Sequence, residues 1–210
     1  MSDKEKERYY RVEADVNLDC IDHNIKQIKK IIEPETKIMV IIKADGYGHG
    51  AIPIAKRLNH LVDGYGIAIV EEGIQLRKAG INKEILILGY TPTQQYTQLV
   101  KYDISPTIFS YSAAKELSKV ALKENKTVAI HIKIDTGMNR LGFSCNTESV
   151  KEIKKISLLD GIRIEGIFTH FACADEENKS STYKQLEDFL DLIYLLEKEG
   201  VFIPTKHISN

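Results

Sequence analysis

The chain has 210 residues, of which 43% are hydrophobic, and this is enough apolar surface to bury a core. Such a composition excludes a chain that is disordered throughout. Lysine and arginine number 29 against 30 aspartate and glutamate, so the net charge of −1 produces no long-range field that would gather nucleic acid or an anionic membrane. We therefore expect neither nucleic acid nor a membrane as a partner.

The first ten residues, 1–10, form a charged run with no apolar stretch behind it, which predicts neither a signal peptide nor an anchor. No later segment reaches the roughly 18–20 apolar residues that a membrane-spanning helix needs. Three cysteines, Cys20, Cys145 and Cys173, lie far apart without a C-x-x-C pair. This spacing favours reduced thiols over a disulfide framework or a zinc site. Together these features predict a cytoplasmic protein without a metal centre.

Short β-branched runs alternate with longer stretches of helical period along the chain. After a leading segment, 11–18, and a helix over 21–32, the pattern predicts seven strands. The strands are 37–42, 65–70, 84–88, 104–109, 127–134, 163–169 and 206–209. The helices between them are 52–61, 71–79, 93–102, 113–124, 148–156 and 182–198. Because whole helices separate the strands, they cannot pair as hairpins, and a parallel sheet with right-handed crossovers is expected.

The strand predicted over 127–134 helps to choose between the two parallel α/β architectures. Its side chains alternate between an apolar face and a largely polar one. The apolar face has Val128, Ile130, Ile132 and Ile134, and the other has Thr127, Ala129, His131, Lys133 and Asp135. In a doubly wound sheet helices cover both faces, which should then be apolar, whereas a barrel lumen can hold polar side chains near its C-terminal mouth. The pattern favours a TIM-type (β/α)8 barrel.

A complete barrel of this type typically needs about 250 residues, and the sequence reaches only the seventh predicted strand. About seven of the eight strands are therefore expected, with the last unit missing. Since an open barrel leaves strand edges unpaired and prone to aggregation, we expect residues 1–210 to be a single barrel domain truncated from a longer protein.

The segment VIIKADGYGHG, residues 40–50, is the most informative stretch of the sequence. A buried strand ends in Lys43, at the rim where barrel enzymes place their active sites. A lysine amine can form a Schiff base once desolvation lowers its pKa, and the glycines leave room for backbone N–H groups to approach a phosphate. The residues alone leave a second interpretation open, in which Lys43 extends into water and the glycines form an ordinary turn.

This segment resembles the signature of the alanine racemase family, fold-type III enzymes that use pyridoxal 5′-phosphate. Two later segments, IDTGMNRLG at 134–142 and GIFTHFA at 166–172, also resemble family motifs, in the same order and at similar separations. The resemblance extends over nearly the whole chain. It implies a homodimeric enzyme that racemises L-alanine and D-alanine and supplies D-alanine for cell-wall peptidoglycan. Lys43 would be the Schiff-base lysine and one of two catalytic bases.

The same resemblance implies roles for three further side chains at the expected rim. Tyr47 would contact the cofactor phosphate, although a tyrosine in a glycine-rich loop can simply pack. Arg140 would hydrogen-bond the phenolic oxygen of the cofactor and pair with the substrate carboxylate, a task suited to its planar guanidinium. Without the motif, Arg140 would be read as facing solvent. His170 would form a wall against the pyridine ring, and a structural hydrogen-bonding histidine is the alternative.

Lys133 is expected on the lumen face, where a buried ammonium is costly without an anion. In many family members the lysine at this position is carbamylated and orients the arginine; alternatively, Asp135 pairs with unmodified Lys133. Asp175 is either on the corridor to the site or a solvated loop acid. His207 and Asn210 lie on the last predicted strand, where the resemblance implies a cofactor-binding role for Asn210.

The family pattern also requires groups that these residues do not contain. The second base is a tyrosine from a C-terminal β domain of the other subunit, and an arginine lies beside the pyridine nitrogen. We therefore expect residues 1–210 to form a cofactor-anchoring half-site with little or no activity alone. Three alternatives stay open: a racemase for serine or another small amino acid, a barrel for pyridoxal-phosphate homeostasis, and a phosphate-binding barrel without an imine. The loop 45–50 argues against the homeostasis barrel.

Overall fold

The computed structural model describes residues 12–208, and the chain divides into two compact units, 1–36 and 37–210. The first unit contains α1 (Leu18–Ile31). The side-chain oxygen of Asn17 accepts the N–H groups of Asp19 and Cys20 and caps this helix. The capping residue explains why α1 begins three residues before the predicted helix. The charged run 1–10 lies outside the described residues.

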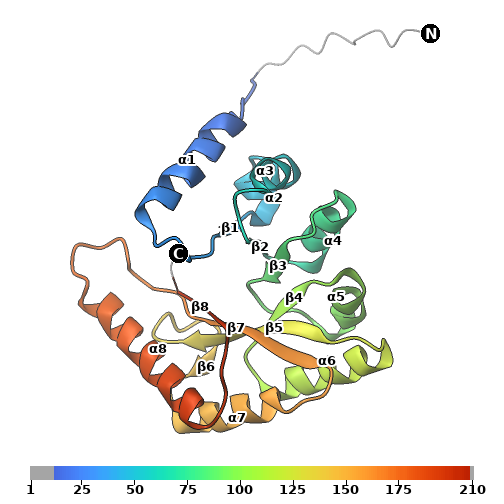
Figure 1. Cartoon of the computed structure of the whole chain (residues 1–210), viewed down its shortest axis with the longest axis vertical. Coiled ribbons are helices and arrows are strands. Elements are labelled where there is room, and N and C mark those ends of the chain that lie inside the picture. Colours follow the sequence, from blue (N-terminus) through green and yellow to red (C-terminus); the bar gives the residue numbers. More distant parts are fainter. Residues whose placement is uncertain (1–11, 209–210) are drawn as a thin grey trace. The chain divides into compact units, whose positions relative to one another are not determined.

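The second unit is a curled parallel sheet in the order β1-β2-β3-β4-β5-β7-β8 (Figure 1). Its strands are β1 (Met39–Ile41), β2 (Gly64–Ile67), β3 (Glu84–Ile87), β4 (Ser105–Ile108), β5 (Val128–Asp135), β7 (Ile162–Phe168) and β8 (Thr205–His207). Within the described residues no pairing joins β1 to β8, so the sheet is a half-barrel. The predicted parallel α/β fold with about seven barrel strands is confirmed.

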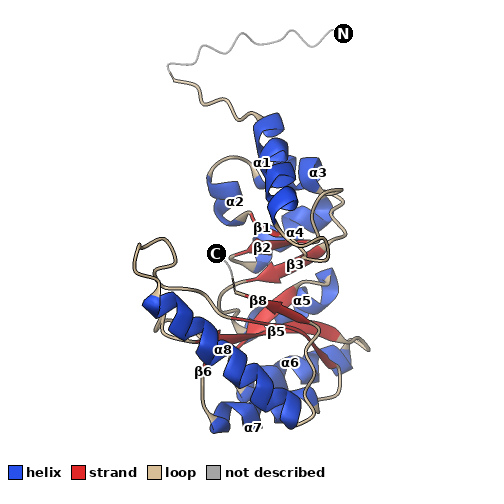
Figure 2. Ribbon diagram, turned by 60° about the vertical axis from the view of Figure 1, so that its left-hand side comes forward, coloured by secondary structure: helices blue, strands red, loops and turns tan. Residues whose placement is uncertain are grey.

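Helices follow the strands and cover the outer face of the sheet. They are α2 (Lys43–Tyr47), α3 (Ala51–Leu58), α4 (Val70–Lys78), η1 (Thr93–Gln95), α5 (Tyr96–Tyr102), α6 (Tyr111–Lys123), α7 (Thr147–Ser157) and α8 (Ser180–Lys198). Figure 2 shows α6, α7 and α8 packed outside β5, β7 and β8. Among the described residues, none of the helices has both the length and the apolar character needed to span a membrane.

Strand β5 has the two faces that its sequence predicts. Ile130, Ile132 and Ile134 are fully buried. On the opposite face, His131 contacts Glu84 on β3 and His207 on β8. In the sheet, β3 and β8 lie on opposite sides of β5, each separated from it by one strand. A side chain of β5 can reach both only on the concave face, because the curvature of the sheet brings the strands closer together there. The polar face of β5 therefore lines the lumen.

Three local features differ from the sequence prediction. A short strand, β6 (Phe143–Ser144), pairs in parallel with the end of β5, and two residues are too few to produce a pattern. The segment after β1 forms the helical turn α2 where a loop was expected. The last strand begins at Thr205 and ends at His207, and Ser209 of the predicted strand lies outside the described residues.

Candidate functional site

The candidate side chains lie at the carboxyl ends of three strands. Lys43 follows β1, Lys133 is near the end of β5, Arg140 is in the loop after β5, and His170 follows β7. The carboxyl ends of parallel barrel strands share one rim. Burial lowers the pKa of the His170 imidazole, and the charges of three cations lower it further. These cations are Arg140, Lys133 and Lys43, so the structure brings all three within electrostatic range of His170.

Lys43 is half-buried, and its amino group lies 5.8 Å from the centre of the Tyr47 ring. The ring of Tyr47 is 59% exposed. Tyr47 therefore stands beside the lysine at the open side of the rim and is not packed into the core. This placement leaves the tyrosine hydroxyl accessible to a ligand.

The backbone after Lys43 is left-handed over four successive residues. Ala44, Asp45, Gly46 and Tyr47 have φ angles of 50°, 51°, 64° and 56°. For residues other than glycine, a left-handed helical conformation costs about 1–2 kcal/mol each. Runs of this kind persist only where the surroundings over-determine them, and they cluster at functional sites. The segment that carries Lys43 is therefore strained.

Two carboxylates hold this left-handed turn. Asp45 accepts the N–H of Ala51, the first residue of α3, at 2.8 Å. Glu72, in the first turn of α4, accepts the N–H of Ala44 at 2.7 Å. The turn is thereby tied to the two helices that follow it in the chain.

Asp135 organises the loop that carries Arg140. Its carboxylate accepts the N–H groups of Gly137, Asn139 and Arg140 at 3.0, 3.0 and 2.9 Å. Burial raises the pKa of this carboxyl, but the three hydrogen bonds and the charge of Lys133 together outweigh burial, and the pKa is lowered. The Asp135 carboxylate is thus occupied by backbone, and in the described residues it forms no ion pair with Lys133. The Arg140 side chain itself is exposed.

Lys133 is buried in the lumen with an exposed fraction of 4%. Its amino group donates to the Ile134 carbonyl at 2.6 Å and lies 5.5 Å from the centre of the Phe168 ring. Burial lowers the pKa of Lys133 to about 8, against the opposing effect of Asp135 and with a further lowering by Arg140. Burial thus makes the neutral form of this amine more accessible than that of an exposed lysine.

Gln185 on α8 connects the two loops of the candidate site. Its Nε2 donates to the Thr136 hydroxyl at 3.1 Å and to the His170 carbonyl at 3.3 Å. Its Oε1 accepts the N–H of Ala172 at 3.0 Å. Thr136 in turn contacts the Thr169 hydroxyl at 2.8 Å. Sequence analysis missed Gln185; the available signal was a polar residue on the buried face of an otherwise apolar helix stripe.

A polar chain fills the lumen beneath the rim. His131 is fully buried, with Nε2 2.7 Å from the Glu84 carboxylate and Nδ1 2.9 Å from Nε2 of His207. The His207 ring stacks on Phe168 with centroids 4.6 Å apart. Burial, followed by the charge of His131, lowers the pKa of His207 to about 3. His207 is therefore a neutral lumen residue and does not line the rim.

The low pKa of His207 predicts a loss of stability in acid. The pKa of His207 is about 3 in the folded chain and 6.5 in an unfolded one, so between these values the unfolded chain binds a proton that the folded chain does not. The stability of the fold is therefore greatest above pH 6.5 and falls as the pH is lowered toward 3. Each pH unit in that range should remove up to about 1.4 kcal/mol of unfolding free energy, measurable by urea denaturation. His207→Asn should flatten this dependence, whereas His60→Asn, at an exposed position, should leave it unchanged.

Two further sequence predictions, for Asp175 and Asn210, have different outcomes. Asp175 is an exposed residue of the segment between β7 and α8, and within the described residues no contact brings it to the rim. Asn210 lies outside the described residues. The candidate site of the described chain is thus built from Lys43, Tyr47, Lys133, Arg140 and His170.

Comparison with known proteins gives consistent matches. The model of the family described as "Alanine racemase, N-terminal domain" matches residues 16–210. Alanine racemase 1 of Caldanaerobacter subterraneus subsp. tengcongensis is 46% identical over 198 residues, which cover 94% of this chain and 51% of that protein. The alanine racemase of Methanococcus maripaludis is 41% identical and is covered over 53% of its length. The chain spans about half the length of the curated relatives it matches.

Solved structures agree with these sequence matches. The alanine racemase of Clostridium difficile 630 superposes with a TM-score of 0.91 at 43% identity, covering 93% of this chain and 51% of that one. The alanine racemase of Bacillus anthracis with bound L-Ala-P gives a TM-score of 0.86 at 32% identity, covering 92% of this chain and 50% of that one. With the family model matched from residue 16 to residue 210 and the half-barrel shared with these structures, the chain belongs to the alanine racemase family.

Proposed function

We propose that the protein carrying this chain interconverts L-alanine and D-alanine with pyridoxal 5′-phosphate, and that this chain supplies the half-site holding the cofactor through Lys43. The supporting observation is the convergence of Lys43, Lys133 and Arg140 on His170 at one rim of the barrel. Family membership and the L-Ala-P bound by the Bacillus anthracis relative favour alanine as the substrate.

The charge of the rim fits this cofactor and substrate. The cofactor carries a phosphate and a phenolic oxygen, and the amino-acid substrate carries a carboxylate, so the site must hold several anionic groups. Lys43 and Arg140, both within range of His170, match that requirement. When bound, the cofactor delocalises the negative charge left on the α-carbon after its proton is removed.

Each side chain then has a defined task. Lys43 would hold the cofactor through its amine, and the same amine would move the α-proton on one face of the substrate. Tyr47, exposed beside it, contacts the phosphate. Arg140 binds the phenolic oxygen and the substrate carboxylate through its guanidinium fork. His170, whose pKa is lowered, would face the pyridine ring as a wall, and a cofactor contact is also proposed for Asn210, which lies outside the described residues.

Lys133 is proposed to be carbamylated. Its lowered pKa, about 8, leaves part of the buried amine neutral, and a neutral amine adds to carbon dioxide to give an N-carboxylate with release of one proton. The product is an anion beside Arg140, whose charge is among those lowering the pKa of Lys133. Carbamylation thus replaces two neighbouring cations by an ion pair that orients the guanidinium.

The remaining parts of the enzyme belong to the whole protein. We infer a cytoplasmic homodimer in which a C-terminal β domain of the partner supplies the second base, and in which D-alanine is made for the cell wall. Residues 1–210 are then the N-terminal barrel domain and have little or no activity alone.

Reduction of the lysine adduct tests the proposal. The whole protein, incubated with pyridoxal 5′-phosphate and reduced with borohydride, should carry a stable label on the peptide that contains Lys43, as identified by mass spectrometry. The same preparation should convert L-alanine to D-alanine faster than it converts L-serine. A label elsewhere contradicts the role of Lys43, faster turnover of serine contradicts the substrate, and a label without any turnover indicates a binding barrel.

A further inference from the structure

Glu72 joins three elements around the lysine segment. Its Oε1 accepts the N–H of Ala44, the residue directly after Lys43, at 2.7 Å. Its Oε2 accepts the N–H of Ala68 at 2.7 Å and that of Ile69 at 3.4 Å, where the chain leaves β2. One carboxylate on α4 therefore holds the carboxyl ends of two neighbouring strands, β1 and β2, in a fixed relation.

The hydrogen bond to Ala44 lies at the start of the left-handed turn. Ala44 is the first of the four left-handed residues, and alanine has no intrinsic preference for that conformation. Hydrogen bonds to an ionised carboxylate are among the strongest available to a backbone N–H. The Glu72 contact therefore stabilises the first strained residue of the turn and fixes the backbone directly after Lys43.

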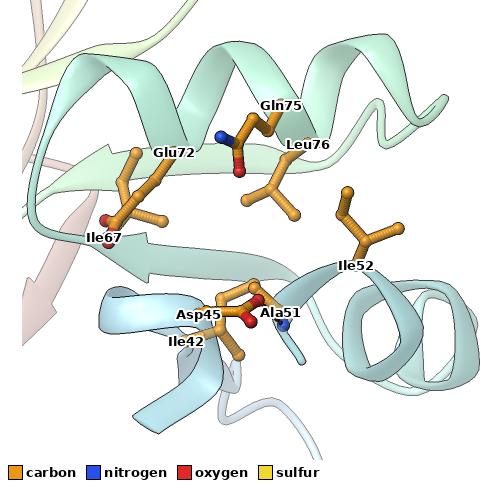
Figure 3. A pocket seen from close by; sticks show the side chains of 8 residues that line it. All are labelled: Ile42, Asp45, Ala51, Ile52, Ile67, Glu72, Gln75 and Leu76. Carbon is orange, nitrogen blue, oxygen red and sulfur yellow. Dashed lines mark hydrogen bonds between the residues drawn. The ribbon is translucent and has the colours of Figure 1, made fainter. Parts of the chain in front are cut away.

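A pocket borders the turn on its helix side. A cavity of about 230 Å³ lies between α2, α3 and α4, with Asp45 and Glu72 among the residues that line it (Figure 3). Figure 3 shows the Glu72 side chain extending from α4 to lie beside Ile67, while Asp45 lies across the pocket, beside Ile42 and Ala51. Gly46 of the turn is buried close to Ile54 and Ala51 of α3, so the two carboxylates act together with this packing to hold the turn.

We propose that Glu72 is a positioning residue for Lys43. By binding Ala44 and Ala68 at the same time, its carboxylate fixes the left-handed turn and directs the lysine amine toward the rim. The consequence for cofactor attachment rests on the proposed function, because it requires that Lys43 be the attachment point. The effect of Glu72 on the left-handed turn is independent of the proposed function.

Hydrogen exchange in the cofactor-free whole protein tests the effect on the turn. Glu72→Ala removes both acceptors, so the Ala44 amide should exchange at least about tenfold faster. Glu72→Gln keeps the volume and one acceptor oxygen, and should expose either the Ala44 or the Ala68 amide. Glu71→Ala is the matched control, because Glu71 is exposed in the same turn of α4, and among the described residues its carboxylate accepts a hydrogen bond from the Gln95 side chain and none from Ala44 or Ala68. This control should leave the Ala44 amide unchanged.

The rate of cofactor attachment tests the consequence for Lys43. Borohydride trapping after timed addition of pyridoxal 5′-phosphate should give at least about fivefold slower labelling of Lys43 in Glu72→Ala and Glu72→Gln than in Glu71→Ala, below the melting temperature of every variant. A role limited to capping α4 would change melting and α4 exchange but neither the Ala44 amide nor the labelling rate, and would overturn the proposal. If Glu72→Ala fails to fold, Glu72→Gln decides.

The two failures are distinguishable. If the unsubstituted protein takes up no label at Lys43, the proposed function is wrong, and the exchange of the Ala44 amide still decides whether Glu72 holds the turn. If the protein is labelled at Lys43 and both Glu72 variants match Glu71→Ala in exchange and labelling, the positioning role is wrong and the proposed function stands.

Discussion

Replacing Lys43 by alanine in the whole protein is expected to lower kcat/KM for alanine racemisation by at least about 10³-fold, because one substitution removes both the attachment point and a proton-transfer group. The lost amine should be replaceable in part from solution, so methylamine should restore measurable turnover. Lys43 is half-buried and follows a strand that ends before it, so the fold should be retained. Activity is measured by the formation of D-alanine and folding by circular dichroism.

Lys56→Ala is the control for this result. Lys56 is an exposed residue in the last turn of α3, on a helix that also borders the lysine segment. Its replacement should leave kcat/KM within about twofold, since exposed positions away from special contacts are nearly neutral. If Lys43→Ala keeps more than about a tenth of the activity, Lys43 neither attaches the cofactor nor carries the proton in the rate-limiting step.

The second large effect is expected for Gly166→Ala in β7. A Cβ at this position would lie 2.9 Å or less from three atoms of the His131 ring. That ring is fully buried and is fixed on both sides by Glu84 and His207, so it cannot move without breaking a buried hydrogen bond. Overpacking together with a lost buried hydrogen bond should reduce the free energy of unfolding by about 3–5 kcal/mol. Urea denaturation measures the change.

Gly89→Ala provides the matched glycine control. A Cβ at Gly89 would have no heavy atom within 4 Å, and its backbone is not in the left-handed region. The substitution should be neutral or stabilising by up to about 1 kcal/mol, through the lower entropy of the unfolded chain. If Gly166→Ala were as stable as Gly89→Ala, the lumen would not be packed as tightly as the structure requires.

The architecture was predictable because the burial pattern of each strand is local. The alternation of β-branched runs with helical stretches located all seven strands of the curled sheet, with differences at their ends of a few residues. Strand β5 also revealed the lumen, since His131 and Lys133 alternate with isoleucines in a single eight-residue strand. The short strand β6 was missed because its pairing depends on the path of the chain after β5.

The side chains at the rim could be predicted from the positions of the strand ends, but the residues that hold them in place could not. Lys43, Lys133, Arg140 and His170 each lie at or after the carboxyl end of a parallel strand, and such ends share one edge. Their roles remain predictions. The left-handed turn at Ala44 could not be inferred locally, because alanine disfavours it and its hydrogen-bond acceptor lies 28 residues further along the chain. Glu72 itself resembles an ordinary acidic residue in the first turn of a helix.

The Gln185 contacts have a mechanical consequence. One amide on α8 binds the segment after β5 through Thr136 and the segment after β7 through the His170 carbonyl. A small sliding of α8 along its axis would therefore carry both segments in the same direction. The backbone segments that carry Arg140 and His170 therefore share one support, and a shift of α8 would change their position relative to β1 more than their position relative to each other.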